Sequence, residues 1–182
     1  MWRADFPLLD GKDLVYLDTA ASAQKPASVL AAMHDFYTTS YANVHRSIYP
    51  LAELAEEAYE GARATVADFV GGAANEIVFV RNATEAINLA AHSYVRPRLG
   101  PGKRIITTIA EHHANYLPWL EGCKAADAEL VLINVGADGE IDWQQLRQEL
   151  RRGAVLVALH HISNVLGTRV PLGKVANMAH AA

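Results

Sequence analysis

Cysteine is nearly absent from the sequence. The single cysteine, Cys123, excludes an internal disulfide framework and fits a reducing compartment. Cys123 lies in a stretch with a helical pattern, where a buried thiol behaves as a small apolar side chain. We therefore interpret Cys123 as a core residue and not as a nucleophile.

Positive charge and long apolar runs are scarce as well. The net charge is −4, so no basic surface indicates nucleic acid or an anionic membrane as a partner. No apolar run approaches the roughly 18 residues that a membrane-spanning helix needs. The N-terminal residues lack the continuous apolar segment of a signal peptide. These absences predict a cytoplasmic protein.

Several common ligand-binding motifs are missing. The segment RLGPGKR contains Gly and Lys but lacks the GxxxxGK[ST] spacing of a phosphate loop, and Arg104 stands where Ser or Thr is required. No GxGxxG is present, which removes the fingerprint of a dinucleotide-binding Rossmann fold. No HExxH or cysteine cluster completes a zinc site.

Apolar segments alternate between two patterns along the 182 residues. The composition, 51% hydrophobic and 20% charged, is typical of a globular protein with a substantial core. Repeated strand–helix alternation predicts an α/β fold with a mainly parallel sheet flanked by helices. Expected strands span 13–18, 76–82, 104–111, 129–135 and 154–162, and expected helices span 26–41, 51–70, 84–95, 114–126, 142–152 and 172–182. Four residues mark helix ends: Pro26, Gly71, Pro118 and Asp142.

Polar side chains follow three of the expected strands. The segments RNATE, AEHHAN and HHISN each come where an apolar run ends. Because ligands bind at the carboxyl ends of parallel strands, we expect these segments to share one edge of the sheet.

Each of these segments also has an ordinary structural interpretation. Thr84 is either the N-cap of a helix or a phosphate contact at a helix N-terminus. The doublet His112–His113 suits a metal poorly, because adjacent strand-end residues point in different directions. A flat imidazole stacked on an aromatic ligand fits as well, with the second histidine packed against its neighbours. Asn164 is a turn residue or a ligand contact.

Five segments together resemble the group II cysteine desulfurases, the SufS/CsdA type of the class V aminotransferase-like family. They are YLDTAASAQKP, NVHRSIY, VFVRNATEAINLAA, EHHANYLPW and HISNVLGTRVPL. The resemblance implies pyridoxal 5′-phosphate (PLP) as cofactor and a homodimer of PLP-dependent transferase fold type I. It also implies conversion of L-cysteine to L-alanine with an enzyme persulfide, selenocysteine as a second substrate, and a sulfur-acceptor protein for iron–sulfur cluster or thio-cofactor assembly.

The resemblance assigns cofactor contacts to four residues. His112 matches the histidine that stacks on the pyridine ring and takes part in proton transfer. Thr84 matches a phosphate ligand, and Ala83 stands where many relatives have a second threonine. Asn164 matches the asparagine near the PLP 3′-oxygen. PLP itself supplies the electron sink, and the protein orients it.

The resemblance also assigns substrate contacts. Ala20 and Ala21 match small residues that let the substrate approach the backbone. His45 and Arg46 match residues at the substrate entrance, although an exposed loop is the ordinary interpretation of that segment. Asn164 additionally matches a contact to the substrate carboxylate.

Several residues that the family requires have no match. The five lysines lie outside the SGHK-like context of the Schiff-base lysine, and the DGAQ-like segment, the catalytic cysteine and the substrate-binding arginine are missing. We therefore expect an N-terminal segment of a desulfurase that is inactive alone. Residues 1–50 are expected to contribute to the active-site entrance, and residues 51–182 to form the first part of the PLP-binding large domain. The alternatives are a catalytically silent binding module and another enzyme of the same family.

Overall fold

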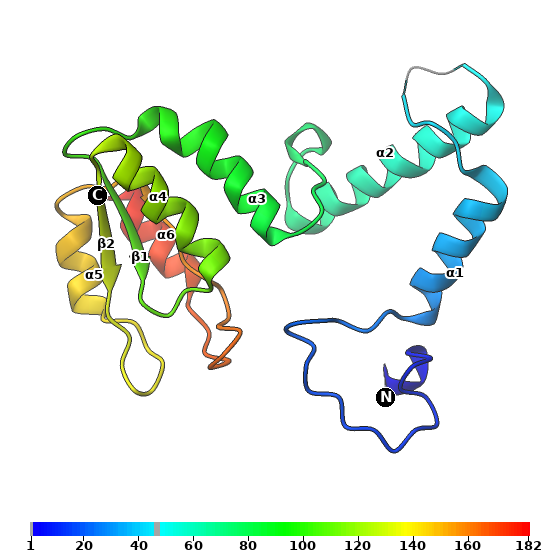
Figure 1. The fold of residues 1–182 in the computed structure, drawn as a ribbon, viewed down its shortest axis with the longest axis horizontal. Helices are drawn as coiled ribbons and strands as arrows, with labels where there is room; N and C mark the ends of the chain where they lie inside the picture. The colour runs from blue at the N-terminus through cyan, green and yellow to red at the C-terminus, as the bar shows by residue number, and fades with distance from the viewer. Residues whose placement is uncertain (1, 46–47) are drawn as a thin grey trace. The chain divides into compact units, whose positions relative to one another are not determined.

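A computed structural model describes residues 2–45 and 48–182 (Figure 1). The chain divides into two compact units, Met1–Phe79 and Val80–Ala182. The expected boundary at residue 50 coincides with the start of a helix within the first unit, and the assignment of the two segments stays a prediction.

The first unit is helical. A 3-10 helix at Trp2–Asp5 precedes α1 (Ala27–Asp35), which continues as a π turn at Phe36–Ser40. The long helix α2 (Pro50–Val70) ends at Gly71, whose φ of 75° is the left-handed conformation expected of a C-capping glycine. A further 3-10 turn covers Ala74–Glu76. Both long helices confirm the sequence-based expectation.

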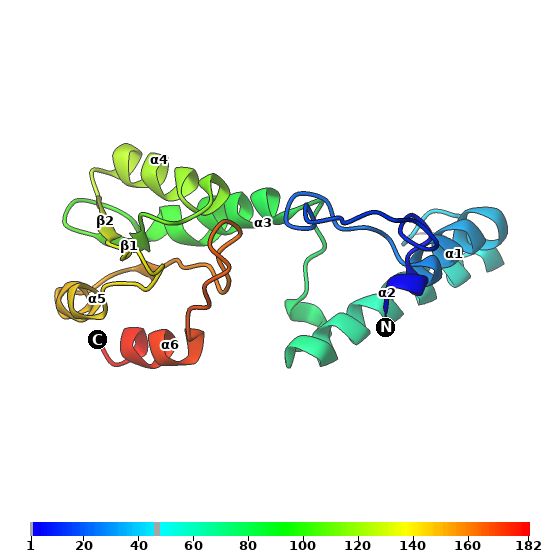
Figure 2. The same ribbon diagram turned by 90° about the horizontal axis from the view of Figure 1, so that it is seen from below.

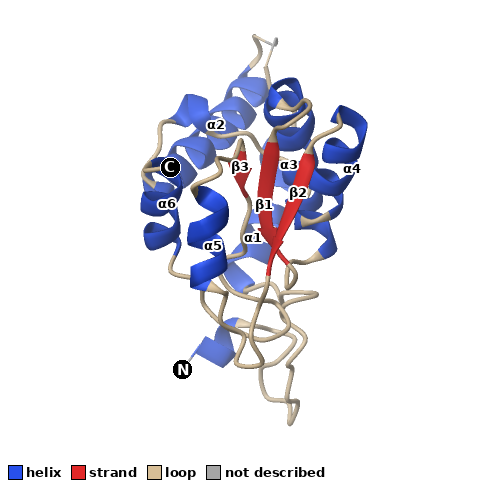
Figure 3. Cartoon of the chain, turned by 90° about the vertical axis from the view of Figure 1, so that its left-hand side faces the viewer, coloured by secondary structure: helices blue, strands red, loops and turns tan. Residues whose placement is uncertain are grey.

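The second unit contains a parallel sheet of three strands (Figure 3). The strands are β1 (Arg104–Thr108), β2 (Glu129–Ile133) and β3 (Leu156–Val157). Their order is β2-β1-β3, with β1 in the centre. All five residues of β1 are buried, as expected for a strand covered on both faces.

Helices cover both faces of this sheet (Figures 1 and 2). They are α3 (Ala83–Ala90), α4 (Leu117–Ala126), α5 (Trp143–Leu150) and α6 (Leu172–His180). A π turn at Ala91–Val95 and 3-10 turns at Arg96–Arg98 and His113–Asn115 complete the unit. Pro118 lies in the first turn of α4, and the Asp142 side chain caps α5 through the N–H groups of Gln144 and Gln145, as predicted.

Two apolar cores result from the alternation of side chains along β1. Ile106 points to the face covered by α5 and α6, where it packs with Leu146 and Val175. Ile105 points to the opposite face, where it packs with Trp119 and Cys123 of α4. Cys123 is 2% exposed, which confirms its place in the core, and burial raises the pKa of its thiol.

Two of the expected strands are wrong, and a third is much shorter than expected. The expected strands 13–18 and 76–82 do not form within the described part of the chain, and Val78 is 67% exposed. An apolar run becomes a strand only where a neighbouring strand accepts its backbone hydrogen bonds. The expected strand 154–162 keeps only Leu156 and Val157, and beyond it the His160 N–H donates to the Glu111 side chain instead of to a neighbouring strand.

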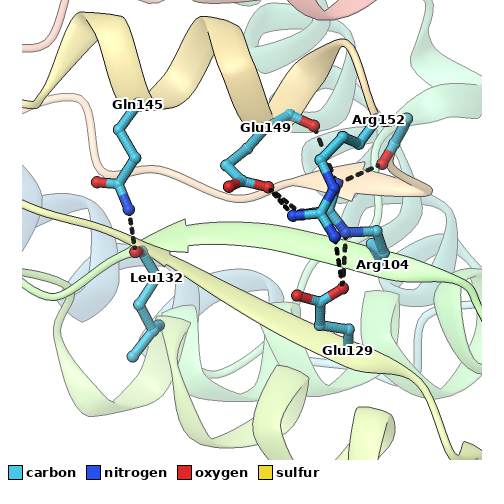
Figure 4. Close-up of polar contacts among 7 residues, drawn as sticks. Arg104, Glu129, Leu132, Gln145, Glu149 and Arg152 are labelled. Atoms are coloured by element: carbon cyan, nitrogen blue, oxygen red, sulfur yellow. Dashed lines mark hydrogen bonds and ion pairs between the residues drawn. The ribbon is translucent and has the colours of Figure 1, made fainter.

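Arg104 opens β1 at the amino end of the sheet (Figure 4). Its side chain is 7% exposed, and the guanidinium forms ion pairs with Glu129 and Glu149. It also donates to the carbonyl oxygens of Glu149 and Gly153, at 3.0 and 3.2 Å. The residue that disqualified the phosphate-loop pattern therefore joins β1 to β2 and to the end of α5.

Candidate functional site

Helix α3 begins one residue earlier than the sequence suggested. Asn82 is its N-cap, and the Asn82 side chain accepts the Glu85 N–H at 2.9 Å. The interpretation of Thr84 as the cap is therefore wrong. Ala83 and Thr84 instead form the exposed first turn, whose N–H groups have no partner within a helix and favour anions.

The one acidic side chain in this first turn is already engaged. Glu85 accepts hydrogen bonds from the Arg81 side chain at 3.0 Å and the Arg81 N–H at 2.8 Å. The Arg81 guanidinium, followed by its backbone N–H, lowers the pKa of Glu85. This pairing offsets the carboxylate charge beside the helix N-terminus.

The ring of His112 is held by the backbone. The Ala114 N–H donates to His112 Nδ1 at 3.1 Å, and His112 thereby caps the short helix His113–Asn115. An Nδ1 that accepts this bond carries no proton, so a neutral ring carries its proton on Nε2. The sequence segment EHHAN thus fixes both the orientation and the tautomer of an exposed imidazole.

Thr84 and His112 line one cavity, which has a volume of about 480 Å³. The cavity lies against α3 and the start of α4. Its walls are Thr84, Asn88, Arg96, His112, His113, Ala114, Leu117, Pro118 and Glu121. Two side chains that lie far apart in the sequence, and that were assigned to a phosphate and to a pyridine ring, therefore face the same space.

The doublet His112–His113 differs from the expectation that one member faces a ligand and the other packs against its neighbours. His113 is exposed and lines the cavity beside His112, with the ring centroids 6.3 Å apart. In the second doublet, His160 is the packed member and donates from Nδ1 to Glu111 at 2.9 Å. His161 is exposed and contacts the Arg169 side chain.

Asn164 lies in an exposed turn and does not line this cavity. Its neighbour Ser163 is buried and holds the turn by accepting the N–H groups of Val165 and Leu166, at 3.3 and 3.1 Å. Asn164 nevertheless follows β3 at the same end of the sheet at which His112 follows β1. Its assigned contact with a cofactor stays a prediction.

Apart from Asn164, the expected substrate contacts belong to the first unit. Ala20 and Ala21 are exposed in a turn, and Arg46 lies outside the described residues. His45 has a φ of 68°, and its ring contacts Glu56 at 3.1 Å and Glu60 at 3.7 Å on α2. His45 is therefore held by acidic neighbours, and its role with a substrate stays a prediction.

Sequence reasoning missed the residue with most polar contacts at this end of the sheet. The Glu111 side chain is 1% exposed and accepts four hydrogen bonds. In the sequence, Glu111 is a single acidic residue between an apolar run and two histidines, and this pattern does not predict a buried carboxylate with four donors. Asn88, Arg96 and Glu121 in the cavity wall were missed as well, because a helical pattern does not show which polar residues face a ligand.

The described part of the chain contains neither a candidate metal site nor a membrane-spanning helix. It holds no cluster of three or more His, Cys, Asp or Glu side chains able to bind a metal ion. Nor does any of its helices have the length and apolar character to cross a membrane.

The class V aminotransferase family model matches residues 15–182. The chain belongs to this family. It is 47% identical to a cysteine desulfurase of Dickeya dadantii and 42% identical to a probable cysteine desulfurase of Halalkalibacterium halodurans. These two alignments cover 98% and 96% of this chain, respectively. The chain spans about 45% and 44% of the length of these two relatives.

Solved structures agree with these relatives. The cysteine desulfurase of Thermococcus onnurineus, solved in its apo form, gives a TM-score of 0.92 at 34% identity, over 98% of this chain and 44% of that one. The cysteine desulfurase CsdA of Escherichia coli gives 0.85 at 39% identity, over 99% and 45%. The expected family and the expected α/β fold of PLP fold type I are both confirmed.

The residues at the cavity fit a phosphorylated aromatic cofactor in part. The exposed first turn of α3 and the Thr84 hydroxyl suit a phosphate, and the exposed His112 imidazole offers a flat face for stacking. No lysine lines this cavity within the described residues. Lys124 pairs with Glu121, and Lys174 lies over the Trp143 ring.

Proposed function

We propose that this chain contributes the cofactor-facing half of a PLP-dependent cysteine desulfurase. The observation that carries the proposal is the cavity shared by Thr84 and His112, in a chain of the class V aminotransferase family. The proposed reaction transfers the sulfur atom of L-cysteine to an enzyme thiol, which gives L-alanine and a persulfide. PLP, when bound, supplies the electron sink for breaking the carbon–sulfur bond.

The residues of this chain have distinct proposed roles. Ala83 and Thr84 hold the phosphate through backbone N–H groups and one hydroxyl. His112 would lie on the ring and would move a proton through Nε2, because the Ala114 N–H already donates to Nδ1. Asn164 would contact the 3′-oxygen of the cofactor and the substrate carboxylate.

Cys123 does not fit the role of sulfur acceptor. It is buried among Ile105 and Trp119, and burial raises the pKa of its thiol, so little thiolate forms at neutral pH. The proposed acceptor thiol therefore lies elsewhere in the protein. The persulfide then passes to a separate acceptor protein, and the proposed functional unit is a homodimer.

The test compares the full-length protein with the 182-residue chain. Each is supplied with PLP and L-cysteine, and alanine and borohydride-trapped adducts are measured. We expect alanine from the full-length protein and none from the 182-residue chain. Stoichiometric trapping at one lysine of the short chain, with sustained alanine formation, would contradict the proposal that the covalent anchor lies outside it.

A substrate panel separates the alternatives within the family. L-cysteine, L-selenocysteine and L-cysteine sulfinate are offered at equal concentrations to the full-length protein. Alanine from cysteine and selenocysteine supports the proposed desulfurase. Turnover of the sulfinate alone would indicate a sulfinate lyase instead.

A further inference from the structure

Glu111 is a buried carboxylate surrounded by donors. Its Oε1 accepts the Thr108 hydroxyl at 3.1 Å, and also the His160 N–H at 3.1 Å and His160 Nδ1 at 2.9 Å. Its Oε2 accepts the Asn115 amide at 2.8 Å. A carboxylate with 1% exposure is tolerated only when its oxygens are paired in this way.

These bonds join three segments that are separate in the sequence. Thr108 ends β1, and His160 follows β3, 49 residues after Glu111. Asn115 in turn accepts the indole N–H of Trp119 at 3.1 Å, and Trp119 is buried in α4. One carboxylate therefore connects the ends of two neighbouring strands with the start of a helix.

The connection lies between two residues of the proposed site. Glu111 directly precedes His112, whose ring faces the cavity. His160 precedes Asn164 by four residues in the segment after β3. The pair Glu111–His160 therefore limits how far these two segments can move apart.

We propose that Glu111 is a positioning residue that holds His112 and the His160–Asn164 segment in register for the cofactor. This inference rests on the proposed function. Glu111 acts through its neighbours and does not itself touch the cofactor. Its effect is greatest on the geometry of the bound ring, because His112 is assigned to the face of that ring and Asn164 to its 3′-oxygen.

Two substitutions test the pair. Glu111→Gln keeps the size of the side chain but places an NH₂ group against a donor in either amide orientation, because donors face both oxygens. His160→Phe removes the Nδ1 donor. His160→Asn is the conservative variant, since its amide can donate from the position of Nδ1.

The matched control is Glu129→Gln. Glu129 is a carboxylate at the opposite, amino end of the same sheet, where it pairs with Arg104. Its replacement perturbs the sheet without touching the segments after β1 and β3. Any effect that it shares with Glu111→Gln is therefore a general effect of lower stability.

Two readouts use the full-length holoenzyme: the affinity for PLP and the visible circular dichroism per bound PLP. The third readout is the amide hydrogen exchange of residues 109–115 and 158–164 in the cofactor-free protein. For Glu111→Gln we expect roughly tenfold weaker PLP binding, an altered dichroic band and faster exchange in both segments. His160→Phe should show the same changes as Glu111→Gln. His160→Asn and Glu129→Gln should keep the wild-type dichroism.

Two results distinguish the inference from the function on which it rests. Unchanged affinity and dichroism in Glu111→Gln would overturn the positioning role, even if the variant is less stable. A wild-type protein that binds no PLP would overturn both the proposed function and the cofactor role of Glu111. In that case, faster exchange in both segments of Glu111→Gln would still show that the carboxylate joins them, and unchanged exchange would refute this as well.

Discussion

Replacement of Arg104 by Met removes a buried guanidinium and leaves an apolar stem of similar length in its place. The guanidinium makes two hydrogen bonds to the carbonyl oxygens of Glu149 and Gly153, and each bond to a charged donor contributes about 1.5 kcal/mol or more. The Glu129 side chain is 51% exposed, so its ion pair adds about 0–1 kcal/mol.

Glu149 moderates the loss in the Arg104→Met variant. Its carboxylate keeps a second partner, Arg152, at 2.9 Å, so the full penalty of an unpaired buried charge does not apply. We therefore expect Arg104→Met to lower the free energy of unfolding by about 3–4 kcal/mol. Arg152→Met is the matched control, because this arginine is 59% exposed and should lose less than about 1 kcal/mol.

The effect should depend on pH with a definite sign. The Arg104 hydrogen bond is the largest cause that lowers the pKa of Glu149 below its ordinary value of 4.5. A carboxylate with a lowered pKa in the folded state stabilises the protein above its unfolded-state pKa, and this stability is lost as the pH falls through the folded-state pKa. The difference between wild type and Arg104→Met should therefore shrink as the pH falls below about 4.5.

Urea denaturation of the dilute 182-residue chain, followed by the fluorescence of Trp119 and Trp143, measures this difference. Both tryptophans belong to the unit that contains Arg104. A loss below about 1 kcal/mol at pH 7 would refute the assignment of Arg104 as the main polar connection at the amino end of the sheet. A difference that stays constant with pH would refute the role of Glu149.

Three further outcomes follow from the geometry. Thr84→Val in the full-length protein should weaken PLP binding by roughly 1–3 kcal/mol in a cofactor titration, while Thr84→Ser should keep the wild-type affinity. Equal PLP affinity of Thr84→Val and wild type would leave Thr84 as an ordinary helix residue. His112→Ala in the full-length protein should weaken PLP binding or slow alanine formation, and equal turnover of this variant and wild type at equal PLP occupancy would reject the stacking role. His113→Ala replaces an exposed side chain and should change the free energy of unfolding by less than about 0.5 kcal/mol. Leu146→Ala should cost about 2–5 kcal/mol in urea denaturation, because Leu146 is fully buried between α5 and the sheet, and a loss below about 1 kcal/mol would contradict that packing.

The sequence by itself determined the fold class, the family and most helices. Helical spacing, Gly71, Pro118 and Asp142 located helix ends because these signals are local: a left-handed cap, a ring without an N–H and a side-chain acceptor act within one turn. The β-branched residues Ile105 to Thr108 marked the central strand for the same reason, since side chains of this shape favour a strand wherever they stand in the chain.

Only the tertiary structure decided which side chains meet. Ile77–Val80 has the composition of a strand yet forms none, because a strand depends on partners that sequence pattern does not reveal. The contact between Glu111 and His160 spans 49 residues, and the ion pair of Arg104 with Glu149 spans 45. Such contacts follow from parallel strand order and register, which bring residues that are distant in the sequence to the same end of the sheet. Strand order and register have no signal in the local sequence pattern.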